Sequence, residues 1–244
     1  FERAIEERRY ETLETDRDGF TNILHECASK SGLRNAMVTI VATRGIPISG
    51  HKDLRSCQNR LMVWVVPYYS VVTEEESSTG CDIVVANTLR IPPEAVDPTI
   101  KNYGRLDFVR SLFEAYDRKA NYAVLLDSEG NVTEGRGWNI FGLQKGRLVS
   151  PDDGVLPGIT RKTVIELAGQ LNIEARLDKM TVHELRAAEE VFLTSTAGGI
   201  VPVRSIDGET IGEGEAGPVT QRLTKMYWDL HDDDAYSTPI RYQN

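Results

Sequence analysis

Two hydrophobic patterns in the first third of the chain predict a helix followed by two strands. Over residues 17–31, apolar side chains recur every three or four positions, the spacing of a helix with one buried face. Residues 36–42 and 60–66 are short runs rich in β-branched side chains, typical of strands, and glycine and proline punctuate the loop expected at 45–57. The polar stretch 74–80, with its glutamates, serines and glycine, predicts a linker that follows a small N-terminal domain.

The rest of the chain predicts helices alternating with strands and hairpins. A helix is expected at 106–118, with one apolar face made of Leu106, Val109, Leu112, Phe113 and Tyr116. The other expected elements are strands at 82–89 and 190–196, hairpins at 122–134 and 138–150, helices at 160–171 and 217–230, and a capping box at 181–184. This pattern indicates an α/β (α+β) protein with a small α/β domain at 1–73 and a larger domain at 81–244.

Charge and composition narrow the range of partners. The 244 residues carry 28 Lys and Arg against 37 Asp and Glu, a formal net charge of −9, so nucleic-acid binding is not expected. No apolar run approaches the ~18 residues that a membrane span needs. The three cysteines, Cys27, Cys57 and Cys81, are widely separated, which favours a reducing, cytoplasmic setting. The chain begins at Phe1 without a methionine, and we expect an N-terminally shortened sequence.

Two charged residues, Lys101 and Glu134, lie at the ends of predicted strands and are candidate catalytic residues. Lys101 follows the expected extended stretch 97–100, which places it at a strand end. A lysine that forms a Schiff base needs desolvation to lower its pKa, although most lysines are solvated surface charges. Glu134 ends a predicted strand and precedes Gly135 and Gly137, which let a ligand approach the backbone. The alternative for Glu134 is a solvated hairpin acid.

Two further patterns are suited to an anion such as a phosphate. Gly158, Ile159 and Thr160 open a predicted helix, where free backbone N–H groups meet the positive end of the helix dipole. The run TSTAGG at 194–199 places hydroxyl groups and glycines at a strand end. Each pattern alone also fits an ordinary helix start or turn. The four histidines have no metal-ligand spacing, and GxSxG and Walker sequences are absent.

Taken together and in this order, four motifs resemble the fold-type IV pyridoxal-phosphate enzymes. They are PTIKN at 98–102, VTEGRGWN at 132–139, GVLPGITRK at 154–162 and TSTAGG at 194–199. That family includes branched-chain and D-amino-acid aminotransferases, (R)-selective amine transaminases and aminodeoxychorismate lyases. The motif spacing, and an ending in which 218–229 is followed by Ala-Tyr-Ser at 235–237, look closest to the (R)-selective amine transaminases. The resemblance runs from about Arg3 to the C-terminus and implies the two-domain fold, whose larger domain is a pseudo-barrel.

The resemblance also implies roles for individual residues. Lys101 would form the Schiff base with pyridoxal 5′-phosphate and then move a proton between the substrate and cofactor carbons. Glu134 would face the pyridine nitrogen and keep it protonated. Leu156 would pack on the ring. The phosphate would be bound by a set drawn from three segments: Arg3, Ile159, Thr160, Ser195 and Thr196.

Departures from the family pattern bear on the substrate. After the lysine, this chain has Tyr103-Gly-Arg105-Leu in place of a Leu-Gln-Trp-Gly type of segment, and position 136, usually a small residue, is Arg136. The loop at 46–50 lacks the arginine that normally binds the keto-acid carboxylate. We therefore expect Arg105 or Arg136 to recognise that carboxylate, near Ala197; two outward-pointing arginines are the alternative.

By resemblance, the predicted activity is ping-pong transfer of an amino group from an (R)-amine or D-amino acid to a keto acid such as pyruvate, in a homodimer. Three alternatives stay open: a branched-chain or D-amino-acid aminotransferase, an aminodeoxychorismate lyase, and a non-catalytic binding protein of the same fold. No metal and no membrane partner are expected.

Overall fold

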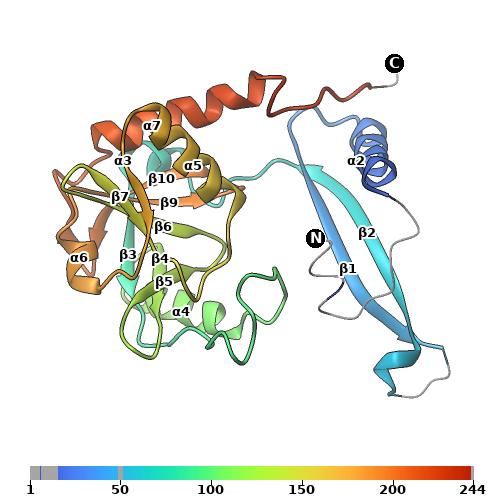
Figure 1. Cartoon of the computed structure of the whole chain (residues 1–244), viewed down its shortest axis with the longest axis horizontal. Helices are drawn as coiled ribbons and strands as arrows, with labels where there is room; N and C mark the ends of the chain where they lie inside the picture. Colours follow the sequence, from blue (N-terminus) through green and yellow to red (C-terminus); the bar gives the residue numbers. More distant parts are fainter. Residues whose placement is uncertain (1–5, 7–15, 49–51, 243–244) are drawn as a thin grey trace. The chain divides into compact units, whose positions relative to one another are not determined.

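The chain forms two compact units. The structure is a computed structural model that describes residue 6 and residues 16–48 and 52–242. One unit comprises residues 1–69 with 238–244, and the other comprises residues 70–237 (Figure 1). The stretch expected as a linker is instead helix α3 (Glu74–Thr79) of the second unit. The helix forms because Thr73 and Glu76 cap each other: Glu76 N–H donates to Thr73 Oγ1 at 3.1 Å, and Thr73 N–H donates to Glu76 Oε2 at 2.7 Å.

The first unit is a helix and a long antiparallel hairpin. Helix α2 (Arg17–Ser31) begins at Asp16, whose side chain accepts a hydrogen bond from Gly19 N–H, and ends at Gly32 in the left-handed conformation. Strands β1 (Ala36–Pro47) and β2 (Cys57–Pro67) pair antiparallel and extend into the predicted loop, with the short 3₁₀ helix η1 (Leu54–Ser56) before β2. The C-terminal segment packs on this unit, because Tyr242 Oη donates to Leu33 O at 2.6 Å.

The second unit is built on one nine-stranded sheet. Its strand order is β5-β4-β3-β10-β9-β6-β7-β8, with β11 paired to β10. An isolated bridge joins Gly135, the last residue of β5, to Trp138, which directly precedes β6. The sheet curls into a half-barrel, where the resemblance implied a pseudo-barrel (Figure 1). The strands are β3 (Cys81–Val85), β4 (Tyr122–Leu126), β5 (Val132–Gly135), β6 (Asn139–Gln144), β7 (Arg147–Ser150), β8 (Ala175–Leu177), β9 (Glu190–Ser195), β10 (Gly199–Ile206) and β11 (Glu209–Thr210).

Side-chain alternation along these strands divides the core into an inner and an outer part. On β6, Ile140 lies in the cluster inside the curl, whereas its neighbour Phe141 packs outward among residues of α5 (Ile159–Gln170) and α7 (Pro218–Asp229). On β4, Val124 points inward and Leu125 joins a third cluster with α4 (Leu106–Asp117). The sheet is therefore covered by helices on its outer face, as Figure 1 shows for α5 and α7.

Local capping explains where the outer helices begin. Helix α7 starts with Pro218, and the buried Glu190 carboxylate accepts from Thr220 N–H at 2.8 Å and from its hydroxyl at 2.6 Å. The short helix α6 (Val182–Arg186) has the predicted capping box between Thr181 and Glu184. A 3₁₀ turn, η2 (Leu230–Asp232), follows α7. Within the described part of the chain, no helix is both long and apolar enough to cross a membrane.

Helix α4 has the predicted bounds within one residue but presents a different face to the core. Its buried residues are Asp107, Phe108, Ser111 and Ala115. Most of the apolar face expected from the sequence is exposed, with side chains at 39–78% exposure: Leu106, Val109, Phe113 and Tyr116. Periodicity identifies an apolar stripe but not what covers it, and here a second, smaller stripe packs on the sheet.

Candidate active site

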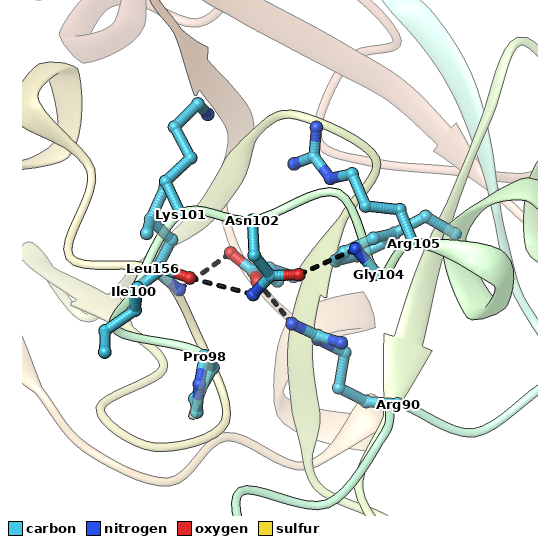
Figure 2. A pocket seen from close by; sticks show the side chains of 10 residues that line it. Arg90, Pro98, Ile100, Lys101, Asn102, Gly104, Arg105 and Leu156 are labelled. Atoms are coloured by element: carbon cyan, nitrogen blue, oxygen red, sulfur yellow. Dashed lines mark hydrogen bonds and ion pairs between the residues drawn. The ribbon is translucent and has the colours of Figure 1, made fainter. Parts of the chain in front are cut away.

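One pocket collects the charged residues that the motifs singled out. It is lined by residues from the loop between β3 and α4, by Glu134 at the end of β5, and by Leu156 from the loop before α5 (Figure 2). The loop residues are Arg90, Pro98, Ile100, Lys101, Asn102, Gly104, Arg105 and, at the start of α4, Phe108. Lys101, Glu134, Leu156 and Arg105 are thus brought together by elements distant in the sequence.

Lys101 lies in a loop and not, as expected, at the end of a strand. Residues 98–100 form a turn, because Asp97 accepts hydrogen bonds from Thr99 and breaks any extended run. After the lysine, Asn102 holds the loop: its Nδ2 donates to Ile100 O at 2.9 Å, and its Oδ1 accepts from Gly104 N–H at 2.8 Å (Figure 2). These bonds fix the backbone on both sides of Lys101.

Lys101 is exposed to solvent on one side, and the groups on its other side lower its pKa. Desolvation lowers the pKa of Lys101, the positive charge of Arg105 lowers it further, and Glu134 opposes both. A lysine with a lowered pKa has more of its free amine at neutral pH, and the free amine is the form that attacks a carbonyl.

Glu134 is a buried carboxylate with three hydrogen-bond donors around it. Its Oε2 accepts from Leu156 N–H at 3.0 Å and from Asn139 Nδ2 at 3.2 Å, and its Oε1 lies 3.3 Å from Arg90 Nη2. Burial raises the pKa of Glu134, while the Leu156 N–H group and the Arg90 charge lower it. The next residue, Gly135, is required because a Cβ there would lie 2.0 Å from the Trp138 ring.

Arg90 and Asp107, which the sequence analysis did not identify, support this carboxylate. Arg90 Nη1 donates to Asp107 Oδ2 at 2.6 Å, and its guanidinium carbon lies 4.4 Å from the centre of the Phe108 ring. All three side chains are buried. The sequence offered one signal for this pair: Arg90 is a charged residue that follows shortly after the apolar run of β3.

Asn139 connects Glu134 to the start of α5. Besides its bond to Glu134, its Nδ2 donates to Leu156 O at 2.9 Å. Gly158 approaches so closely that a Cβ would lie 2.2 Å from Asn139 Oδ1, and this glycine gives α5 an N-terminus without a side-chain cap. No capping side chain therefore competes for the first N–H groups of α5, at Ile159 and Thr160, and an anion such as a phosphate could bind there. The motif contained Asn139, but its role was missed.

The remaining predicted residues lie around this framework. Ser195 ends β9, one residue beyond Thr194, which pairs with Asn139 across the sheet. Thr196 and Ala197 follow it in the turn before β10, where Ala197 N–H donates to Ser195 Oγ at 3.3 Å. Arg105 is half-buried and repelled by Arg136, so these two cations share one neighbourhood. Arg3 lies outside the described residues.

Arg161, on the first turn of α5, is a further buried cation that the sequence analysis overlooked. Its Nη1 donates to Pro151 O at 2.6 Å. Burial lowers the pKa of Arg161, and the negative charge of Glu134 opposes that shift. Glu134 therefore has positively charged neighbours on several sides.

Comparison with known proteins agrees with this geometry. The family model described as amino-transferase class IV matches residues 2–206. A branched-chain-amino-acid aminotransferase of Escherichia coli K12 is 34% identical over 175 residues, which cover 70% of this chain and 56% of that protein. Among solved structures, the branched-chain amino acid aminotransferase of E. coli superimposes with a TM-score of 0.87 at 27% identity, covering 97% of this chain and 78% of that one. The enzyme of Thermobaculum terrenum, solved in its PLP form, gives a TM-score of 0.87 at 25% identity, covering 98% and 80%.

The larger unit is a curled sheet on which Lys101 and the buried Glu134 line one pocket. The chain belongs to the class IV aminotransferase family. The expected fold class is confirmed, and so is pyridoxal phosphate as the cofactor of this family. The sequence match covers little more than half of the E. coli relative's length.

Proposed function

We propose that this chain is a pyridoxal-phosphate-dependent aminotransferase that transfers an amino group from an amino acid or amine to a keto acid, with Lys101 and Glu134 at its centre. The observation that carries the proposal is the placement of a lysine whose pKa is lowered and a buried glutamate along one pocket. The pocket offers each group that the cofactor requires. Lys101 has an amine for the aldehyde, Glu134 has an acceptor for the ring nitrogen, and α5 begins with N–H groups for the phosphate.

In this proposal, each residue performs a separate task. The cofactor, when bound, supplies an aldehyde and an electron-accepting ring. Lys101 Nζ binds the aldehyde and, once released, takes up and returns the proton at the donor carbon. Glu134 stays anionic and holds a proton on the ring nitrogen, while Leu156 packs on the ring. The phosphate ligands are Arg3, Ile159, Thr160, Ser195 and Thr196.

The relatives favour a branched-chain amino acid as the donor. These relatives are named as branched-chain aminotransferases, so this alternative is better supported than transfer from an (R)-amine. The (R)-amine or D-amino-acid donor stays as the second candidate because of one observation. Helix α7 (Pro218–Asp229) and the Ala-Tyr-Ser that follows it at 235–237 resemble the ending of that subgroup.

A donor comparison tests the activity. The purified protein is mixed in turn with L-leucine, D-alanine and (R)-1-phenylethylamine, with 2-oxoglutarate as acceptor, and the glutamate formed is measured; pyruvate serves as a second acceptor for L-leucine and the (R)-amine. L-leucine is expected to give the fastest transfer, and a faster reaction with the (R)-amine would select the second candidate. Release of pyruvate from aminodeoxychorismate without an acceptor would indicate a lyase. Absence of bound cofactor and of all transfer would overturn the proposal.

We further propose that Arg105 and Arg136 bind the acceptor carboxylate. No acidic side chain forms a salt bridge with either of them among the described ranges 16–48 and 52–242, and both lie near Lys101 or its neighbours. Arg105→Ala and Arg136→Ala should each raise KM for the keto acid about tenfold, because a charge-assisted hydrogen bond is lost. The control is Arg222→Ala, an exposed arginine on α7, which should leave KM unchanged. Unchanged KM values in both site variants would contradict this assignment.

A homodimer completes the proposal. Helix α4 has an exposed apolar face, formed by Leu106, Val109, Phe113 and Tyr116. Contiguous apolar surface of this kind marks protein contacts, and we assign this face to the contact with a second copy of the chain. We expect sedimentation analysis to show a dimer that Phe113→Asp converts to monomers with loss of activity. Leu177→Asp, at another exposed apolar position, should remain dimeric. A Phe113→Asp variant that stays dimeric would remove α4 from the interface.

A further inference from the structure

Arg90 lies between two buried carboxylates but binds them unequally. Its Nη1 is 2.6 Å from Asp107 Oδ2, whereas its Nη2 is 3.3 Å from Glu134 Oε1. The three side chains are only 4–7% exposed. Each carboxylate is bound by one nitrogen of the guanidinium, and the shorter of these charge-assisted hydrogen bonds is the one to Asp107. The closer partner of Arg90 is Asp107, so its contact with Glu134 stays long.

Asp107 is itself fixed by the backbone on both sides. Its Oδ2 also accepts from Ile91 N–H at 3.1 Å, and its Oδ1 accepts from Phe108 N–H at 2.9 Å. The Phe108 ring lies against the guanidinium of Arg90, at 4.4 Å. Asp107 therefore ties the segment after β3 to the first turn of α4 and sets the distance at which Arg90 stands from Glu134.

The consequence for Glu134 is a difference between its two oxygens. Oε2 accepts from Leu156 N–H and from Asn139 Nδ2, and is saturated. Oε1 has the 3.3 Å contact with Arg90 and keeps room for a shorter hydrogen bond. If Arg90 were released from Asp107, it would move onto Glu134 and occupy Oε1.

We propose that Asp107 is a positioning residue that holds Arg90 back and thereby keeps Glu134 Oε1 available to the N–H group of a protonated aromatic ring. The identity of that ring as the pyridine of the cofactor rests on the proposed function. The link from Asp107 through Arg90 to Glu134 does not, because it is a property of the protein alone. The charged groups that act on Glu134 are Arg90, Lys101, Arg105 and Arg161, and Asp107 lies beyond Arg90.

The test measures the titration of Glu134 in the full chain without cofactor. Carboxyl ¹³C NMR follows Glu134, with its signal assigned by Glu134→Gln, in the wild type and in Asp107→Asn and Asp107→Ala. Both substitutions remove the same charge, but the asparagine oxygen still accepts a hydrogen bond from Arg90 and alanine cannot. We expect Asp107→Ala to lower the pKa of Glu134 most, with an acid dissociation constant about tenfold larger than in the wild type, and Asp107→Asn to lower it less.

Two outcomes would overturn the proposal. Equal changes in Asp107→Asn and Asp107→Ala would mean that only the charge of Asp107 reaches Glu134, without Arg90 moving. No change would mean that the two carboxylates are independent. If Asp107→Ala does not fold, Asp107→Ser replaces it, because its short hydroxyl cannot reach the place of Oδ2.

A second measurement uses the loaded enzyme. If the ring nitrogen depends on Glu134 Oε1, the absorbance change that reports its deprotonation should occur at lower pH in Asp107→Ala, with kcat reduced about tenfold and KM for the donor nearly unchanged. A protein that binds no cofactor would refute the proposed function, whereas the NMR titration would still decide the role of Asp107.

Discussion

Lys101→Ala should abolish turnover, with a loss of at least about 10³-fold in kcat, because the nucleophile and the proton carrier are the same amine. Borohydride reduction should join the cofactor covalently to the wild-type protein and not to the variant, which mass spectrometry of the peptide containing residue 101 will show. Added methylamine should restore part of the activity, since a small amine can enter the space left by the side chain.

The matched control for this prediction is Lys162→Ala. Lys162 is an exposed lysine on α5 whose Nζ lies 3.8 Å from Glu166, so its loss should change neither turnover nor covalent labelling. Transfer at the wild-type rate by Lys101→Ala would refute the central role of this lysine.

Glu134→Gln should lower kcat by about 10²–10³-fold while the protein retains its cofactor. Glutamine has the shape of glutamate and an oxygen for the Leu156 N–H group, but it lacks the charge that holds a proton on the ring nitrogen. Glu129→Gln, an exposed hairpin glutamate bonded to Lys179, is the control and should leave kcat unchanged.

The pH dependence of kcat/KM should also differ between the wild type and Glu134→Gln. Because burial raises the pKa of Glu134, acidification protonates it earlier than an ordinary glutamate. Wild-type kcat/KM should therefore fall on the acid side, and Glu134→Gln should lack that fall. An identical acid limb in both proteins would assign it to another group.

The sequence predicted the positions of most helices and hairpins, but not every strand of the sheet. Helices α2, α5 and α7 and the two hairpins of the larger unit lie where hydrophobic spacing and turn residues placed them. Strand β10 was missed, since its glycine-led start at Gly199 and the interruption at Pro202 hide a strand whose residues are buried on both faces.

Some residues of the site were predictable from the sequence motifs, and others were not. Motif order drew attention to Lys101 and Glu134, which the structure places along one pocket. The pair of Arg90 with Asp107 could not be predicted, because it depends on the path of the loop between β3 and α4 and on which face of α4 turns inward. Local spacing carries no information about either. Asn139 shows the intermediate case, since the motif that contains it and Glu134 was noticed, but its other partner, Leu156, comes from the separate loop before α5.

The hydrogen bond from Tyr242 to Leu33 has a consequence for biosynthesis. The two residues are 209 positions apart, and Ser29 likewise binds Arg241 across 212 positions. A ribosome must therefore release the whole sequence of residues 70–237 before the smaller unit can acquire these contacts. The larger unit can close its sheet during translation, and the smaller one is finished last.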